Sequence, residues 1–285
     1  MELRWEPGHV ESDGERIYFE VSQGRDPVAT VVLNHGGRGS HAVWYQQVAE
    51  FASRYRVITW DCRGFGRSTL HGGQVSVDSS VADLVAVLDT VGVNEAVHLV
   101  GQSMGGLWLT GFAFAHRERI ASLVYTNTLG GLFDAQLDAV YATAIEDQAA
   151  SLATARASGL FELGFSTVTG RRLLETHVTQ AFLYQELGTL SPVSDAGALG
   201  ALSRQRFDAR TFRELGVPAL VIGSTDDPYV PSGLPRAVAE RMGARYIEIE
   251  DAGHSTYFEK PQEWNDAVLT WLAEQSGHAP GSSQR

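Results

Sequence analysis

The chain has 285 residues, enough for one large α/β domain, and its 44% hydrophobic and 20% charged residues are typical of a globular protein. Its net charge of −12 at pH 7 argues against a nucleic-acid or anionic-membrane surface, which would need a basic face. Cys62 is the only cysteine, which excludes an intramolecular disulfide and a cysteine-based zinc cluster. The N-terminal stretch does not look like a signal peptide, and no apolar run is long enough to cross a membrane. We therefore expect a cytoplasmic protein.

Segments typical of strands and of helices alternate over the first 129 residues. The predicted strands cover residues 16–22, 29–34, 55–61, 97–100 and 120–128. The predicted helices cover residues 44–53, 78–91 and 107–115. We expect the strand at 16–22 to lie near an edge of the sheet. Such alternation predicts a mostly parallel sheet covered by helices on both faces.

This alternation stops between residues 130 and 212. Residues 134–157 and 171–187 read as helices rich in Ala, Leu and Glu, and no strand-like run is present, so we interpret 130–212 as a helical insertion. Strands and helices resume over 213–275, with strands at 217–227 and 244–254 and helices at 234–242 and 261–274. The core therefore comprises 1–129 and 213–275, and the small, polar tail 276–285 is expected to be disordered.

A serine follows the predicted strand at 97–100 and is flanked by glycines. The stretch GQSMG, residues 101–105, fits the pattern G-x-S-x-G, in which the glycines allow a strand and a helix to cross closely around a sharp turn. This turn would hold the side chain of Ser103 out at a site. We therefore predict that Ser103 is a nucleophile.

A serine nucleophile needs a base, usually a histidine oriented by a carboxylate. Of nine histidines, only His254 leaves a late strand in a loop at the edge of the sheet where Ser103 is expected. The acid should follow the preceding strand, where two aspartates, Asp226 and Asp227, are adjacent. Extended neighbours point in opposite directions, so only one of them can face His254. We prefer Asp227, because its position relative to Pro218 and Pro228 is the firmer anchor, while a count from Gly223 favours Asp226.

The developing oxyanion of an acyl transfer needs two backbone N–H donors. Met104, directly after Ser103, supplies one, and the turn HGGRG after the strand at 29–34 supplies the other, for which we predict Gly37. We expect Gly36 and Arg38, in the same turn, to contribute to substrate binding.

With these residues assembled, the chain resembles the α/β-hydrolase superfamily from about residue 16 to residue 274. The stretches LNHGGRGSHAVW, VITWDCRGFGRS, GQSMGG, VPALVIGSTDDPYVP and DAGHSTYFEKPQEW are similar to five segments of that family, in its order. The resemblance implies an eight-stranded, mostly parallel sheet, the triad Ser103–Asp227–His254, and a helical cap formed by 130–212. It implies no cofactor and no metal. Arg38 stands where the related proline iminopeptidases have proline, and Met104 where they have tryptophan, which disfavours an aminopeptidase.

The resemblance is strongest to the enol-lactonase and small-carboxylesterase branch. It predicts hydrolysis of a small-molecule ester or lactone through an acyl-enzyme on Ser103. Two alternatives stay open: a carbon–carbon bond hydrolase of the meta-cleavage type, and a non-hydrolytic cyclase or ligand receptor on the same fold. The sequence leaves the substrate and the oligomeric state open. Seven side chains of the insertion are candidates for pocket walls, although packing between its helices is the simpler interpretation of each: Phe133, Tyr141, Phe161, Phe165, Phe182, Leu183 and Tyr184.

Overall fold

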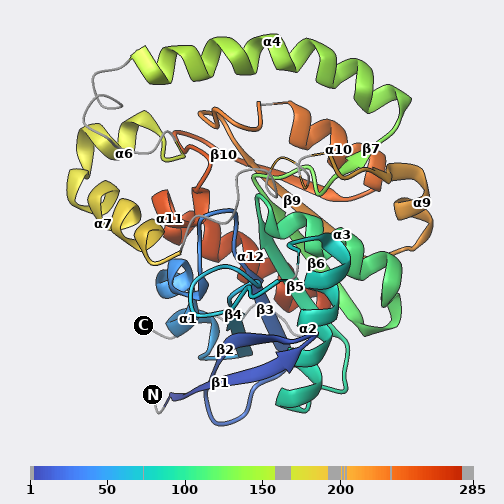
Figure 1. The fold of residues 1–285 in the computed structure, drawn as a ribbon. Coiled ribbons are helices and arrows are strands. Elements are labelled where there is room, and N and C mark those ends of the chain that lie inside the picture. Colours follow the sequence, from blue (N-terminus) through green and yellow to red (C-terminus); the bar gives the residue numbers. More distant parts are fainter. Residues whose placement is uncertain are drawn as a thin grey trace.

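One eight-stranded sheet forms the centre of the molecule (Figure 1). The computed structural model describes residues 3–72, 74–157, 168–191, 200, 202, 204–231 and 233–277. In space the strands follow the order β1-β2-β4-β3-β5-β6-β9-β10. Their bounds are β1 Arg4–Ser12, β2 Glu15–Gln23, β3 Thr30–Asn34, β4 Arg56–Trp60, β5 Val97–Gln102, β6 Ile120–Thr126, β9 Ala219–Ser224 and β10 Arg245–Ile249.

The sheet is mostly parallel, as predicted. Only β2 runs in the opposite direction, antiparallel to its neighbours β1 and β4, whereas the pairs from β4 through β10 are all parallel. Parallel strands of this kind are buried on both faces and read as apolar runs rather than as alternating patterns. The five residues of β3 and the six of β5 are accordingly all buried.

The edge strand β1 is one of the elements that sequence reasoning missed. Its residues RWEPGHVES are mostly exposed, so burial imposes no hydrophobic alternation on them. Pro7 and Gly8 also disfavour a strand, although proline is tolerated at a sheet edge. The predicted strand at 16–22 corresponds to β2, which lies second from this edge.

Helices cover both faces of the sheet and enclose two apolar cores. Successive strand residues point to opposite faces, so Val32 and Leu99 belong to one core and Val31 and Val100 to the other. The first core is covered by α2 Val77–Val91, α3 Gly105–Ala115, α9 Ala209–Glu214 and α10 Leu234–Met242. The second is covered by α1 Tyr45–Phe51, α11 Thr256–Glu259 and α12 Pro261–Gln275. Two 3₁₀ turns, η1 His41–Trp44 and η2 Arg117–Arg119, complete these layers.

The stretch 130–212 contains the helices α4 Ala135–Ala157, α6 Arg171–Thr176 and α7 Val178–Thr189. Figure 1 shows α4 across the top of the molecule, with α6 and α7 to its left. The predicted helix at 171–187 is in fact two helices, because the backbone of His177 leaves the helical conformation, at φ −138° and ψ +52°.

The prediction that this stretch lacks strands is wrong. Two short strands, β7 Leu132–Phe133 and β8 Phe207–Asp208, pair in parallel near its two ends. A strand of two residues is too short to produce a detectable period of two in the sequence.

The predicted disordered tail, residues 276–285, is described only at its first two positions, and residues 278–285 lie outside the described residues. Ser276 contacts the core, since its hydroxyl lies 3.1 Å from Nε2 of His98. Within the described residues, every helix is too short or too polar to cross a lipid bilayer.

Candidate active site

Ser103 occupies the sharp turn between β5 and α3. Its backbone φ is +51°, a left-handed conformation that is strained for a residue with a side chain. A Cβ on Gly101 would lie 2.7 Å from the carbonyl oxygen of Gly105, and one on Gly105 would lie 2.5 Å from that of Asn34. The glycines of the G-x-S-x-G pattern are therefore required by close backbone contacts, as the sequence predicts.

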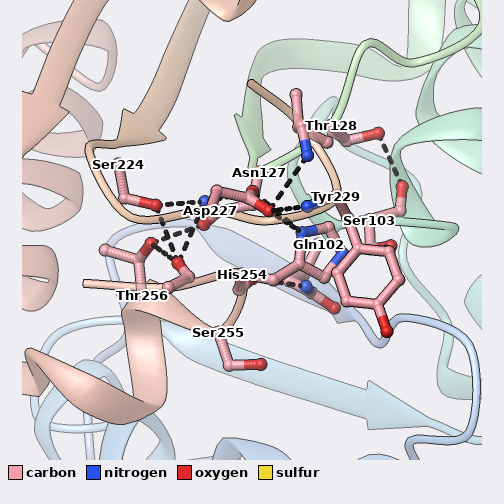
Figure 2. Close-up of polar contacts among 12 residues, drawn as sticks. Gln102, Ser103, Asn127, Thr128, Ser224, Asp227, Tyr229, His254, Ser255 and Thr256 are labelled. Carbon is pink, nitrogen blue, oxygen red and sulfur yellow. Dashed lines mark hydrogen bonds and ion pairs between the residues drawn. The ribbon is translucent and has the colours of Figure 1, made fainter. Parts of the chain in front are cut away.

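His254 lies in the loop after β10 and contacts both Ser103 and Asp227 (Figure 2). Its Nε2 is 2.8 Å from Oγ of Ser103, and its Nδ1 is 2.9 Å from Oδ2 of Asp227. With the Nδ1 proton donated to the carboxylate, Nε2 is left as an acceptor for the serine hydroxyl. The ring of Tyr229 packs on the imidazole at a centroid distance of 5.1 Å.

Asp227, rather than Asp226, is the carboxylate that contacts His254. Asp227 is 5% exposed, whereas the neighbouring Asp226 faces solvent. Oδ1 of Asp227 accepts hydrogen bonds from the backbone N–H groups of Tyr229 and Val230, at 2.8 and 3.0 Å. These bonds within its own turn fix the direction of the carboxylate, as short aspartate turns do.

Two amide side chains form hydrogen bonds to Asp227 and to the backbone of His254. Asn127, directly after β6, donates Nδ2–H bonds to Oδ2 of Asp227 at 3.0 Å and to Oγ of Ser224 at 2.7 Å. Gln102, at the end of β5, donates a 2.9 Å bond to the backbone carbonyl of His254. The sequence analysis assigned no role to Asn127 or Gln102. The place of Gln102 directly before Ser103 was the signal in the sequence that could have identified it.

The two predicted oxyanion donors, Gly37 and Met104, both line the same cavity as Ser103. Within the described part of the chain, neither backbone N–H donates a hydrogen bond, so both groups are available to a ligand. His35 stabilises the turn that carries Gly37: its Nδ1 lies 2.8 Å from the carbonyl oxygen of Gly36, and its Nε2 accepts from the N–H of Cys62 at 3.1 Å.

The two residues predicted to contact substrate lie in different surroundings. Arg38 is exposed and lines the cavity beside Gly37. Gly36 is buried, and a Cβ there would lie 2.0 Å from Oε1 of Gln102 and 3.1 Å from Cβ of Ser103. The close packing of Gly36 therefore supports the positions of Ser103 and Gln102, and Gly36 is absent from the described cavity wall.

A half-buried carboxylate, Glu259, connects the His254 loop to the insertion. Its Oε2 accepts from the backbone N–H groups of Gly170 and Gly253, at 2.9 and 3.1 Å. The N–H of His254 in turn donates to the carbonyl oxygen of Val168 at 3.0 Å. Burial raises the pKa of Glu259 to about 7, although these backbone donors oppose the shift. Sequence reasoning did not select Glu259, which it treated as part of the loop after His254.

A cavity of about 560 Å³ opens beside Ser103. This volume is within the range of small-molecule sites in proteins. Core residues such as Met104, Leu107 and Thr128 form one part of its wall, and the insertion contributes Val168, Leu202 and others. The site can therefore hold a mid-sized, largely apolar molecule against the serine.

The seven side chains proposed as pocket walls divide into three groups. Phe133, Tyr141 and Tyr184 line the cavity. Phe182 and Leu183 are 57% and 40% exposed and are not part of its described wall. Phe161 and Phe165 lie outside the described residues.

The comparison with protein families identifies the class. The family described as alpha/beta hydrolase fold matches residues 29–261, which is most of the chain. The protein belongs to this family.

Several relatives are named as hydrolases. A putative carbamate hydrolase of Caulobacter segnis is 29% identical over 86% of this chain and 93% of its own. The 3-oxoadipate enol-lactonase 2 of Acinetobacter baylyi is 28% identical over 80% of this chain and 82% of its own. Among solved structures, a thermophilic esterase from Thermogutta terrifontis superimposes with a TM-score of 0.77 at 22% identity, covering 95% of this chain and 99% of its own. At that identity, the structural likeness establishes the fold.

Proposed function

We propose that this hydrolase cleaves a carboxylic ester or lactone through an acyl-enzyme on Ser103. The observation that carries the proposal is the hydrogen-bonded series Ser103–His254–Asp227 beside a cavity of about 560 Å³. A serine hydroxyl is a weak nucleophile, and a neutral histidine within hydrogen-bond distance is the usual means of activating it.

In the first half of the reaction, Oγ of Ser103 attacks the substrate carbonyl while Nε2 of His254 takes the hydroxyl proton. Asp227 keeps the Nδ1 proton in place and stabilises the resulting imidazolium. The backbone N–H groups of Gly37 and Met104 would hold the developing oxyanion. The tetrahedral intermediate then collapses, and the imidazolium gives its proton to the departing alkoxide.

In the second half, water replaces the alcohol. His254 takes a proton from the water as its oxygen attacks the acyl carbon, and the second tetrahedral intermediate releases the acid and regenerates Ser103. In a lactone, the departing alkoxide stays attached to the acyl group, so one ring-opened hydroxy acid is released. Every step uses protein groups and water alone.

We further propose that residues 130–212 act as a cap over this site. Their contribution to the cavity wall through Phe133, Tyr141 and Tyr184 supports this role. A salt bridge joins Arg241 of α10 to Asp134 at the start of the insertion, with Nε 2.6 Å from Oδ2. This contact attaches the first residues of the insertion to the core. The enol-lactonase and esterase names of relatives support an ester or lactone as the substrate class.

The test is a substrate panel of p-nitrophenyl acyl esters, aliphatic lactones and vinylogous diketones, measured with wild-type protein and Ser103→Ala. We expect turnover of esters or lactones by the wild type, and a loss of about 10⁴-fold or more in kcat for the variant. Turnover of the diketones alone would instead identify a carbon–carbon bond hydrolase. Absence of any turnover would favour a non-hydrolytic cyclase or receptor.

A further inference from the structure

The charged residues on the described cavity wall are both basic. Arg38 and Arg206 line the cavity, and the described wall includes no aspartate or glutamate. The whole chain, by contrast, has 34 acidic and 22 basic residues. A positively charged cavity wall in a negatively charged protein attracts anionic ligands to the cavity.

Arg38 directly follows Gly37, whose N–H is one of the two proposed oxyanion donors. Its backbone φ is +64°, a conformation that costs of order 1 kcal/mol or more for a residue with a Cβ. Glycine would adopt this turn without strain, so the turn itself does not call for an arginine. Within the described residues, the guanidinium has no hydrogen bond or ion pair. Arg38 thus lines the cavity next to Gly37 with no partner for its guanidinium among the described residues.

Arg206 is the second cation and is held more firmly. Its guanidinium stacks over the ring of Phe133, with Cζ 3.9 Å from the ring centroid. Its Nη1 donates to the carbonyl oxygen of Gln205 at 3.0 Å. Stacking of this kind fixes the plane of a guanidinium.

We propose that the substrate is an ester or lactone that also carries an anionic group, and that Arg38 binds this group next to the oxyanion site. The inference rests on the proposed function and names its substrate class. Because Arg38 adjoins Gly37, the anion lies a few bonds from the scissile carbonyl. A guanidinium binds a carboxylate through paired, charge-assisted N–H bonds. Arg206 adds a favourable field without being the direct partner.

The experiment compares two esters that differ in one charge: mono-p-nitrophenyl glutarate, which is anionic, and its methyl-capped counterpart p-nitrophenyl methyl glutarate, which is neutral. The ratio of their kcat/KM values is measured for wild type, Arg38→Gln, Arg38→Lys and Arg206→Gln. Arg204→Gln is the matched control, because it removes the same charge from an exposed arginine outside the described cavity wall.

We expect the wild-type kcat/KM to be about tenfold or more higher for the anionic ester than for the neutral one, because one hydrogen-bonded ion pair contributes a difference of this size. Arg38→Gln should abolish this preference, so that the ratio of the two kcat/KM values falls to about one. Arg38→Lys should restore part of the preference, and Arg206→Gln should reduce it less than Arg38→Gln does. Arg204→Gln should behave as wild type.

Equal turnover of both esters by the wild type would overturn the anion proposal while leaving the hydrolase proposal intact. A preference that survives in Arg38→Gln but is lost in Arg206→Gln would overturn the role of Arg38. Absence of turnover of either ester, together with an unreactive Ser103, would overturn both the substrate class and the hydrolase proposal beneath it.

Discussion

Asn127 donates a hydrogen bond to Asp227, with Nδ2 3.0 Å from Oδ2. Asn127 sits directly after β6 with φ +49°, a conformation that asparagine tolerates better than most residues. Its own Oδ1 accepts a 2.6 Å bond from Oγ1 of Thr256, which fixes the orientation of the amide (Figure 2). The carboxylate that faces His254 is thus held by a side chain from the neighbouring strand.

Replacement of Asn127 by alanine should lower kcat. The variant loses the N–H donor to a buried carboxylate, an interaction of about 1.5–3 kcal/mol, so we expect a fall of about tenfold or more. Steady-state kinetics on any accepted ester measures the change. Thr256→Val, which removes the hydroxyl bonded to the amide oxygen and to the carbonyl of Gly253 but keeps the Asn127 donor, should have a smaller effect. Wild-type kcat in Asn127→Ala would show that Asp227 is oriented without this bond.

The kcat values of Asp227→Asn and Asp226→Asn should differ by several orders of magnitude. An amide at 227 cannot stabilise the imidazolium and favours the wrong tautomer of His254, which costs about 10⁴-fold in kcat. Asp226 faces solvent and should matter by less than about tenfold, or 1.4 kcal/mol. The two kcat values are compared after circular dichroism has verified folding. The reverse order of activities would mean that the acid is Asp226.

Stability should depend on pH through Glu259. Burial raises the pKa of this carboxyl from 4.5 to about 7 in the fold. Its stabilising contribution is therefore complete below pH 4.5 and is lost as the pH rises through 7. Urea unfolding measures the free energy of unfolding of wild type and of Glu259→Gln. The amount by which the wild-type value exceeds the variant's should decrease by about 2 to 3 kcal/mol between pH 5 and pH 8.

The control for Glu259 is Glu263→Gln, an exposed carboxylate on the next helix. Its difference from wild type should stay nearly constant over the same pH interval. A constant difference for Glu259→Gln as well would indicate that the backbone donors Gly170, Gly253 and Ser255 keep it charged throughout.

Gly105→Ala should disrupt the turn at Ser103. The added methyl group would lie 2.5 Å from the backbone oxygen of Asn34, and backbone cannot move aside as a flexible side chain can. We expect destabilisation of roughly 1–3 kcal/mol, the usual cost of overpacking, together with reduced kcat. Thermal unfolding and ester kinetics measure the two effects. Gly72→Ala, which meets open space, is the matched control and should change neither.

The core and the position of the triad were predictable because they follow from strong local constraints. Buried parallel strands produce apolar runs, and the glycines around Ser103 mark backbone contacts that no other residue fits. The choice of Asp227 followed from the spacing of two prolines, which constrain the path of the turn. In the structure, Oδ2 of Asp227 lies 2.9 Å from Nδ1 of His254.

The features that were missed depend on contacts between distant parts of the chain. Glu259 reads as one more residue of a loop, and only the fold brings Gly170 beside it, 89 positions away in sequence. The edge strand β1 is exposed and therefore has no hydrophobic signature. The pairing of β7 with β8 joins segments separated by the whole insertion, a relationship that no local pattern encodes.

The most direct test of the central claim is covalent labelling of Ser103. Wild-type protein is treated with a fluorophosphonate, which phosphonylates activated serines, and the adduct is located by mass spectrometry of peptides. We predict one adduct, on Ser103, with none in Ser103→Ala and labelling slowed by at least about 10³-fold in His254→Ala, since the base that activates the hydroxyl is then absent. An adduct on another serine, or equally fast labelling without His254, would contradict the assignment of Ser103 as the nucleophile.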